Sequence, residues 1–387
     1  MRLGSTQRFA DGRWEFYNPV HTVFGVDTLP LVADLVDGSH VLFLTTSGFA
    51  KRGLTDEVTH MLGSSLVEVV DNIEPNPELA QLERLVEDLR HMDFDTIVAL
   101  GGGSVIDTAK VISAVLPRIG EGFSLRAHLE RNASELTETG IPVVAIPTTA
   151  GTGAEVTPFA TVWDLGAKKK YSLSGPGLFP KVALVDPSLT LTLPREQTLI
   201  SGLDAVSHAF ESIWNRNATP ITIMYATEAL RIAMPTLPLV VEDLGNLEHR
   251  TKMLEASLFA GLAISNTRTA LAHSISYPLT LNYGVPHGLA CSFALPAILR
   301  FNAEEDDGRL SGLARSLEFP SVQDLFQYVS LFLDRLTAQR MLSEYINSDL
   351  EEFKGQTLEM LSSDRLDNNL RKVHREDLLG IITGSLS

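Results

Sequence analysis

The sequence predicts an α/β domain over residues 1–193, followed by an all-α domain over residues 194–387. Strand-like and helix-like segments alternate in the first half of the chain, which is typical of a parallel sheet with helices on both faces. The alternation ends near residues 180–195, in the stretch KVALVDPSLTLTLP, where a last strand is followed by a proline-marked turn. From Glu196 onward, one segment after another has apolar residues at helical spacing.

The first domain is expected to contain several buried strands joined by helices. HVLFLTT (40–46) is a continuous apolar run, and further strands are predicted over 64–73, 95–103 and 142–149. The predicted helices cover 49–62, 77–92 and 104–116. Pro77 suits the first turn of its helix, where the backbone needs no amide donor.

The second domain is expected to be a series of helices over residues 196–213, 219–235, 247–264, 266–276 and 288–303, with further amphipathic segments beyond. Ligands of open α/β sheets bind outside the carboxyl ends of the strands, and pockets are common at domain boundaries. We therefore expect a ligand-binding cleft between the two domains.

Composition narrows the functional classes. The chain has 387 residues, 44% of them hydrophobic and 20% charged, as in an ordinary globular protein. Its net charge of −17 gives no general attraction to nucleic acid or to an anionic membrane. No segment reads as a secretory signal or a membrane span. The single cysteine, Cys291, fits a reducing compartment, so we expect a cytoplasmic protein.

A glycine-rich turn is the first candidate binding site. The stretch ALGGGSVIDTAK (99–110) joins a predicted strand to a predicted helix. Glycines let a phosphate approach the backbone, whose free N–H groups at a helix start point toward the anion. Asp107 can cap or hydrogen-bond within this turn. The spacing is neither G-x-G-x-x-G nor a P-loop, so a tight strand–helix turn is the alternative interpretation.

A second polar loop follows the predicted strand at 142–146. The stretch PTTAGTGAEVTPFATVWD (147–164) offers the hydroxyls of Thr148, Thr149, Thr152 and Thr157. Alone it can be read as a surface turn rich in threonine and glycine. Two such loops at the same end of neighbouring strands would favour a pyrophosphate site.

The stretch SGLDAVSHAFE (201–211) is the first candidate metal site. Asp204 and His208 are four residues apart, so a helix would present both on one face, and the surrounding residues are apolar. A buried carboxylate is costly unless it is paired or bound to a metal. His273 and His287 could complete a three-histidine, one-carboxylate site with an open position. The alternative is that each is a satisfied core or loop residue, and other histidines are available at 21, 40, 60, 91, 128, 249 and 374.

Several motifs in one order resemble those of the iron-containing (group III) alcohol dehydrogenases over nearly the whole chain. They are GGGSVIDTAK, IPTTAGTGAEVT, SGLDAVSHAFE, ALAHSISYPL, GVPHGLACSFALP and RLDNNLRKVHREDLL. The resemblance implies a dinucleotide-binding α/β domain and a helical domain, the architecture also found in dehydroquinate synthase-like proteins. It further implies Fe2+ or Zn2+, a nicotinamide cofactor, and a homodimer or larger homo-oligomer.

The resemblance also assigns roles to individual residues. It makes Asp204, His208, His273 and His287 the metal ligands. It places the cofactor against Asn76, Gly102, Gly103, Ser104, Asp107, Thr148, Thr149, Thr152 and Lys170. Thr46, after the first strand, and Thr157, in the second polar loop, are further candidates for cofactor binding.

Two departures from the family pattern affect these expectations. Tyr277 stands where many relatives have a second histidine assigned to proton relay. Tyr277 can still donate a hydrogen bond and is a candidate catalytic residue. Its reference pKa near 10 makes it a poor general base at neutral pH, so the alternative proton route runs through water or the cofactor ribose. An aspartate that binds the ribose in NAD-specific relatives is absent from FLTTSGFAKRG (43–53). We therefore expect NADPH to be accepted, alone or together with NADH.

The expected reaction is reduction of an aldehyde, in which a metal stabilises the negative charge that hydride transfer builds on oxygen. Arg268, five residues before His273, and Arg216, eight residues after His208, are candidates for binding an anionic substrate. The alternative for each is a surface or salt-bridge residue. Within the family, the stretches around them resemble reductases of phosphonoacetaldehyde, which form 2-hydroxyethylphosphonate in phosphonate-antibiotic biosynthesis.

Other functions remain open at this stage. The enzyme could reduce a neutral short aldehyde, such as lactaldehyde or 3-hydroxypropionaldehyde, or maleylacetate. A dehydroquinate-synthase-like lyase or a glycerol-1-phosphate dehydrogenase would use the same architecture with a different ligand set. A catalytically silent binding protein is a third class, against which the four candidate ligands argue.

Overall fold

The computed structural model describes residues 12–131, 136–346 and 366–386, and the chain forms two compact units. The described residues of Asn18–Thr149 and Gly153–Thr192 form the first unit. Those from Leu193 onward form the second, together with residues 12–17 and Ala150–Thr152.

The first unit contains a six-stranded parallel sheet in the order β1-β8-β5-β4-β2-β3. This confirms the predicted α/β fold. The strands are β1 (His21–Phe24), β2 (Val41–Leu44), β3 (Leu66–Val70), β4 (Thr96–Gly101), β5 (Val143–Pro147) and β8 (Val182–Val185). Strand β1 was not predicted, because it is a short, only partly buried strand at the edge of the sheet.

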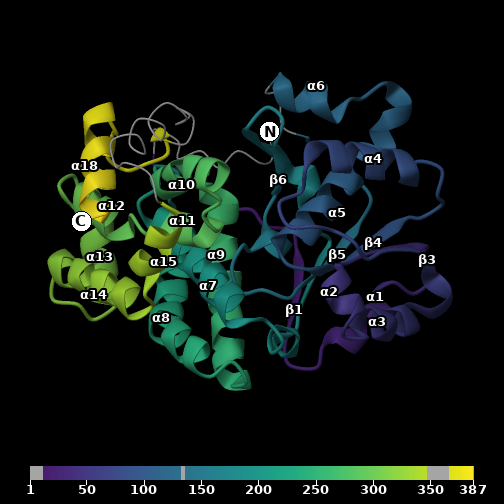
Figure 1. The fold of residues 1–387 in the computed structure, drawn as a ribbon, viewed down its shortest axis with the longest axis horizontal. Helices are drawn as coiled ribbons and strands as arrows, with labels where there is room; N and C mark the ends of the chain where they lie inside the picture. Colours follow the sequence, from purple (N-terminus) through teal and green to yellow (C-terminus); the bar gives the residue numbers. More distant parts are fainter. Residues whose placement is uncertain (1–11, 132–135, 347–365, 387) are drawn as a thin grey trace. The chain divides into compact units, whose positions relative to one another are not determined.

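Both faces of this sheet are covered, which explains why its central strands are continuous apolar runs. Leu42 and Leu44 of β2 pack into one core, whereas Val41 and Phe43 pack into the other. The first core is closed by α4 (Leu79–Leu89), α5 (Gly103–Val115) and α6 (Leu125–Glu130). The second is closed by α1 (Val32–Leu35) and α3 (Leu54–Leu62), which lie on the opposite face (Figure 1).

The strand order reverses between β2 and β4. From β2 the chain runs outward to β3, and then crosses back over β2 to β4 and onward to β5. The helices that follow β2 and β4, α3 and α5, therefore cover opposite faces. Ligands of such sheets bind at this switch point, outside the carboxyl ends of the two strands. The loop at Thr46 and the turn at Gly102 follow those ends.

Part of the threonine-rich segment predicted as a loop is a strand. Residues 159–164 form β6 (Phe159–Asp164), which pairs antiparallel with β7 (Lys169–Ser174). The chain turns between them with Lys168 at φ 50°. The prediction missed this hairpin because threonine and proline upstream dominated the pattern.

Several predicted helices differ from the observed ones at breaks that have local causes. The predicted helix 49–62 is divided into α2 (Ser47–Ala50) and α3 by Gly53, whose φ is 80°. The predicted helix 288–303 is divided into α11 (His287–Ser292) and α12 (Leu295–Ala303). Pro296 lies in the first turn of α12 and has no amide hydrogen with which to continue α11.

The second unit is helical, as predicted. Helix α7 (Arg195–Ile213) packs against α8 (Pro220–Glu242), α9 (Leu247–Thr267) and α11. Helix α10 (Leu271–Tyr283) follows α9 after a short break, so the predicted helix start at residue 266 was wrong. The remaining described helices are α13 (Arg309–Ser316), α14 (Val322–Arg335), α15 (Ala338–Tyr345) and α18 (Arg375–Leu386).

None of the helices in the described part of the chain is both long and apolar enough to cross a membrane.

Gly288 allows α11 to approach α7 closely. A Cβ atom at this position would overlap the carbonyl oxygen of Ile200 and would lie 3.1 Å from Cβ of Asp204. The two backbones are therefore in contact where the helices cross.

We expect Gly288→Ala to lower the free energy of unfolding by about 1–3 kcal/mol, because α11 must move away from α7. Gly312→Ala in α13 is the matched control, since a Cβ atom there meets nothing within 4 Å. That variant should be unchanged or more stable by about 0.5–1 kcal/mol. Urea denaturation of both variants provides the measurement, and equal stabilities would contradict the close approach.

Candidate metal centre and nucleotide-binding turn

Helix α7 presents Asp204 and His208 on one face, as their spacing predicts. Nε2 of His208 lies 3.7 Å from Oδ1 of Asp204. Both side chains are buried, with 4% of Asp204 and 6% of His208 exposed. On the other side of the His208 ring, Nδ1 lies 3.4 Å from the carbonyl oxygen of Gly151. This contact directs Nε2 toward Asp204.

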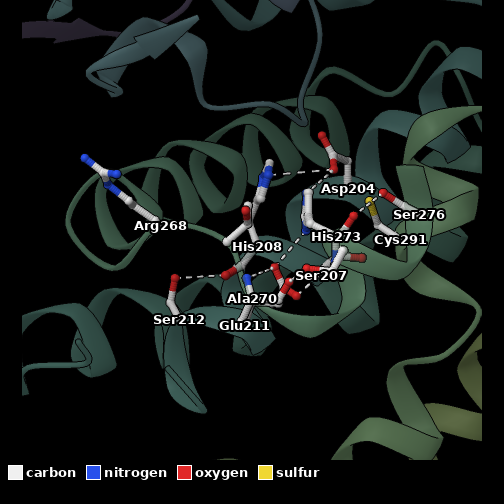
Figure 2. Close-up of polar contacts among 12 residues, drawn as sticks. Asp204, Ser207, His208, Glu211, Ser212, Arg268, Ala270, His273, Ser276 and Cys291 are labelled. Atoms are coloured by element: carbon white, nitrogen blue, oxygen red, sulfur yellow. Dashed lines mark hydrogen bonds and ion pairs between the residues drawn. The ribbon is translucent and has the colours of Figure 1, made fainter. Parts of the chain in front are cut away.

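Helices α10 and α11 bring two further histidines to this pair, and Figure 2 shows the first of them, His273, beside Asp204 and His208. Nε2 of His273 lies 3.5 Å from the same oxygen of Asp204. The ring of His273 stacks on His208 at a centroid distance of 4.7 Å and meets the ring of His287 edge-on at 5.2 Å. The structure thus gathers all four predicted ligands, Asp204, His208, His273 and His287.

Cys291 also lies in this cluster, although we did not predict it as a site residue. It is fully buried, one helical turn after His287 in α11. The ligand atoms of Asp204, His273, His287 and Cys291 all lie within 4.8 Å of one another. The signal in the sequence was the spacing of four residues between His287 and Cys291, the same as between Asp204 and His208.

Glu211 is the second site residue that the sequence analysis missed. Its carboxylate is fully buried in α7 and lies 2.8 Å from Nδ1 of His273. It also accepts hydrogen bonds from the backbone N–H groups of Ala270 and His273 (Figure 2). A carboxylate on Nδ1 fixes the ring and leaves Nε2 free to face Asp204.

The histidines of the cluster lower the pKa values of its two buried carboxylates, Asp204 and Glu211. Burial alone would raise the pKa of Asp204, but His208, His273 and His287 hold that pKa well below its usual value. Burial also opposes ionisation of Glu211, and the ring and backbone contacts of His273 still lower its pKa. Both carboxylates are therefore ionised at neutral pH, inside a protein core.

The arrangement fits a divalent metal ion. Oδ1 of Asp204 and Nε2 of His273 are buried and have no hydrogen-bond partner among the described residues. Such atoms are costly to bury unless something else satisfies them. Two nitrogen or oxygen donors of a tetrahedral zinc-type site lie about 3.4 Å apart, because each is about 2.1 Å from the ion. The separations of 3.5 and 3.7 Å at Asp204 match that geometry.

Three further residues of this unit were predicted for the site, namely Tyr277, Arg268 and Arg216. The ring of Tyr277 is parallel to that of His287, at a centroid distance of 6.4 Å. Arg268 is exposed, and Figure 2 shows its guanidinium directed away from Asp204 and His273. Arg216 is exposed on a neighbouring loop.

The backbone at Arg268 is unusual, with φ 63° and ψ 173°. This region is populated almost only by glycine and costs a non-glycine residue about 1–3 kcal/mol. The conformation is held by three asparagine side chains, which donate to three successive carbonyl groups, those of residues 267, 268 and 269. The donors are Asn217, Asn215 and Asn368.

In the first unit, the glycine turn has the form expected of a phosphate-binding turn. Helix α5 begins at Gly103, directly after the turn at Gly102. A Cβ atom on Gly102 would lie 3.3 Å from the side chain of Thr149, so the two predicted loops meet. The backbone N–H of Asn76, at φ 61°, donates to the hydroxyl of Ser104 at 3.1 Å.

Other side chains that were predicted to bind the cofactor have contacts within the first unit. Asp107 accepts from the backbone N–H of Thr161, and the hydroxyl of Thr157 accepts from the buried ammonium of Lys110. Both side chains are therefore used inside the first unit. The ammonium of Lys170 lies 5.0 Å from the ring centre of Trp163.

Thr148 and Thr152, the other two threonines predicted in the second polar loop, differ in their surroundings. Thr148 is buried, with its backbone N–H bonded to Gly101. Thr152 belongs to the second unit. Cofactor contacts of these side chains stay predictions.

Sequence comparison identifies the family. Residues 19–187 match the model for iron-containing alcohol dehydrogenases, and residues 198–386 match the model for the C-terminal region of that family. A phosphonoacetaldehyde reductase of Streptomyces viridochromogenes is 36% identical over 73% of this chain and 72% of its own length. A 1,3-propanediol dehydrogenase of Citrobacter freundii is 32% identical over 78% of each chain.

Structural comparison agrees. The crystal structure of a sulfoacetaldehyde reductase from Bifidobacterium kashiwanohense, in complex with NAD+, matches with a TM-score of 0.89. That match has 28% sequence identity and covers 97% of this chain and 99% of the other. The chain therefore belongs to the iron-containing (group III) alcohol dehydrogenase family and is an oxidoreductase of that family, as its motifs predicted.

Proposed function

We propose that the protein is a metal-dependent, nicotinamide-linked reductase of a small anionic aldehyde, with phosphonoacetaldehyde as the leading substrate. The observation that carries the metal dependence is the pair of unsatisfied buried atoms, Oδ1 of Asp204 and Nε2 of His273, which lie 3.5 Å apart among imidazole rings. The product would be 2-hydroxyethylphosphonate, and the setting would be phosphonate biosynthesis.

In this proposal, Asp204, His208, His273 and His287 hold a divalent ion. Imidazole nitrogens and one carboxylate suit both Fe2+ and Zn2+. When bound, such an ion supplies a Lewis acid that stabilises negative charge developing on an aldehyde oxygen. The protein's own contribution is orientation, since Glu211 fixes the ring of His273 and the carbonyl of Gly151 contacts that of His208.

The nucleotide is proposed to bind at the switch point of the sheet in the first unit. The N–H groups at the start of α5, after Gly102 and Gly103, favour a pyrophosphate. A nicotinamide cofactor supplies the hydride. The side chains of Arg52 and Thr46 both lie beside Gly48 in the segment after β2. If Gly48 had a Cβ atom, it would be 3.7 Å from a guanidinium nitrogen of Arg52 and 3.6 Å from the hydroxyl of Thr46. A cation without a nearby carboxylate in this segment supports acceptance of NADPH, with NADH also used.

The substrate class rests on two relatives and one residue. Both phosphonoacetaldehyde and sulfoacetaldehyde carry an anionic group on a two-carbon aldehyde, and they are named in the relatives with 36% identity and a TM-score of 0.89. Arg268 is an exposed cation held in a costly backbone conformation near the N-terminus of the helix that carries His273. A costly conformation persists where the surrounding structure enforces it, often at ligand sites.

Reduction of a neutral short aldehyde is the second candidate. It is favoured by the relative named 1,3-propanediol dehydrogenase, which is 32% identical. In that case Arg268 would have no role in substrate selection.

The principal test is a substrate and cofactor screen of the protein loaded anaerobically with Fe2+ or Zn2+. Phosphonoacetaldehyde, sulfoacetaldehyde, lactaldehyde and 3-hydroxypropionaldehyde are compared with NADPH and with NADH by nicotinamide absorbance. We expect kcat/KM to be higher for the anionic aldehydes by at least about tenfold, which corresponds to about 1.4 kcal/mol. A preference for the neutral aldehydes would select the second candidate instead.

We expect Arg268→Ala to raise the KM for phosphonoacetaldehyde by about 10- to 100-fold, the loss expected when a hydrogen bond to a charged group is removed. The KM for lactaldehyde should change little. Arg231→Ala is the matched control, because it removes an exposed arginine from α8 that pairs with Glu228. Equal effects of Arg268→Ala on both aldehydes would exclude a specific anion contact.

We expect Glu211→Gln to weaken Zn2+ binding by about 10- to 100-fold, because an amide cannot accept all three hydrogen bonds that hold His273. Glu242→Gln, which changes an exposed carboxylate on α8, serves as the control. Binding is measured by competition with a chelating dye, and a circular dichroism spectrum verifies folding. Unchanged affinity in folded Glu211→Gln would show that this carboxylate does not orient a ligand.

A further inference from the structure

We infer that Cys291 is itself a ligand of the metal centre, so that the site binds its ion through a thiolate sulfur in addition to carboxylate and imidazole. This inference rests on the proposed metal centre described above and extends its ligand set. It assigns a chemical role to the only cysteine of the sequence.

The first support is the distance between donor atoms. Sγ of Cys291 lies 3.7 Å from Nδ1 and 3.8 Å from Nε2 of His287. In a tetrahedral site, a sulfur about 2.3 Å from the ion and a nitrogen about 2.1 Å from it are about 3.6 Å apart. The distance from Sγ to either nitrogen is therefore within about 0.2 Å of the separation expected if both residues bind one ion.

The second support is that the sulfur of Cys291 belongs to the same group of candidate ligand atoms as the two unsatisfied atoms. The ligand atoms of Cys291, His287, His273 and Asp204 form a set within 4.8 Å of one another. Two members of this set, Oδ1 of Asp204 and Nε2 of His273, are buried and have no hydrogen-bond partner in the described chain. A buried cysteine that only packs needs no such neighbours, since it behaves as a small apolar side chain.

The local structure explains how the sulfur reaches this position. His287 and Cys291 are four residues apart in α11, so the helix presents both on one face. Gly288, between them, permits the contact of α11 with Ile200 and with Cβ of Asp204. The same close approach therefore brings His287 and Cys291 to the carboxylate of α7.

The chemical consequence concerns which ion the site prefers. Thiolate is a soft ligand that favours zinc over harder divalent ions, and Cys291 and Asp204 together would balance the charge of one divalent ion. On coordination, the sulfur forms a bond to the ion and the thiol proton leaves to water, with no change of oxidation state.

Cobalt titration of the metal-free, full-length protein tests the inference, because Co2+ occupies zinc-type sites and a thiolate ligand adds a near-ultraviolet charge-transfer band. No other residue can produce this band, since the sequence contains one cysteine. We expect the band to rise together with the visible cobalt bands and to saturate at one ion per chain.

Visible cobalt bands without the charge-transfer band would overturn the inference and leave the proposed function intact. Failure to bind cobalt at all would overturn both the inference and the proposed metal centre. The wild-type spectrum thus decides the question even if a variant fails to fold.

Variants add an independent measurement. Cys291→Ser should lose the charge-transfer band, keep the visible bands, and bind Zn2+ at least about tenfold more weakly. Ser292→Ala, at the next position of α11, is the matched control, because it changes a buried side chain without removing a sulfur. Wild-type zinc affinity in folded Cys291→Ser would contradict the inference.

Discussion

The ionised carboxylate of Asp204, buried in the core of the helical unit, is the constraint on which the site depends. A carboxylate in such a place requires opposite charge or several hydrogen-bond donors. The described chain gives its Oδ1 no donor, and three imidazole rings surround it instead. These rings lower the pKa of Asp204 only when they are protonated, whereas metal ligation requires neutral rings and supplies the positive charge through the ion. The positions of α7, α10 and α11 therefore suit a bound divalent cation, which would stabilise the carboxylate while the rings are neutral.

One of the candidate ligands, His273, is oriented by a buried residue that is not itself a candidate ligand. Glu211, one turn after His208 on α7, contacts Nδ1 of His273 and the backbone where α10 begins. One buried carboxylate thereby fixes both the start of a helix and the orientation of its histidine. Because burial makes each unsatisfied group costly, this network resists small displacements of the ring. Rings held in this way can meet an ion without reorganisation.

Features determined by residues close together in the sequence were mostly predicted, whereas features that depend on packing between distant segments were mostly not. The central strands were predicted because burial on both faces leaves a continuous apolar run, but β1 and the β6–β7 hairpin have no such run. Asp204 and His208 were predicted as a pair because a single helix determines their geometry. The approach of His273 and His287 depends on how α10 and α11 pack, so spacing left them as two candidates among several histidines and the family resemblance selected them. Cys291 was missed because its spacing from His287 has no meaning until α11 is placed beside Asp204.

The exposed side chain of Arg268 is carried by a loop with a costly backbone conformation. Its backbone conformation is costly for any residue but glycine, yet the side chain of Asn215 and those of two other asparagines bind the carbonyl groups on either side and its own. Glycine would relieve the strain but would remove the charge. The asparagines offset part of the cost by satisfying carbonyl groups at the end of α9 that lack helical partners. Since glycine would make this loop more stable, loop stability does not account for the arginine, and our proposal assigns its guanidinium to substrate selection.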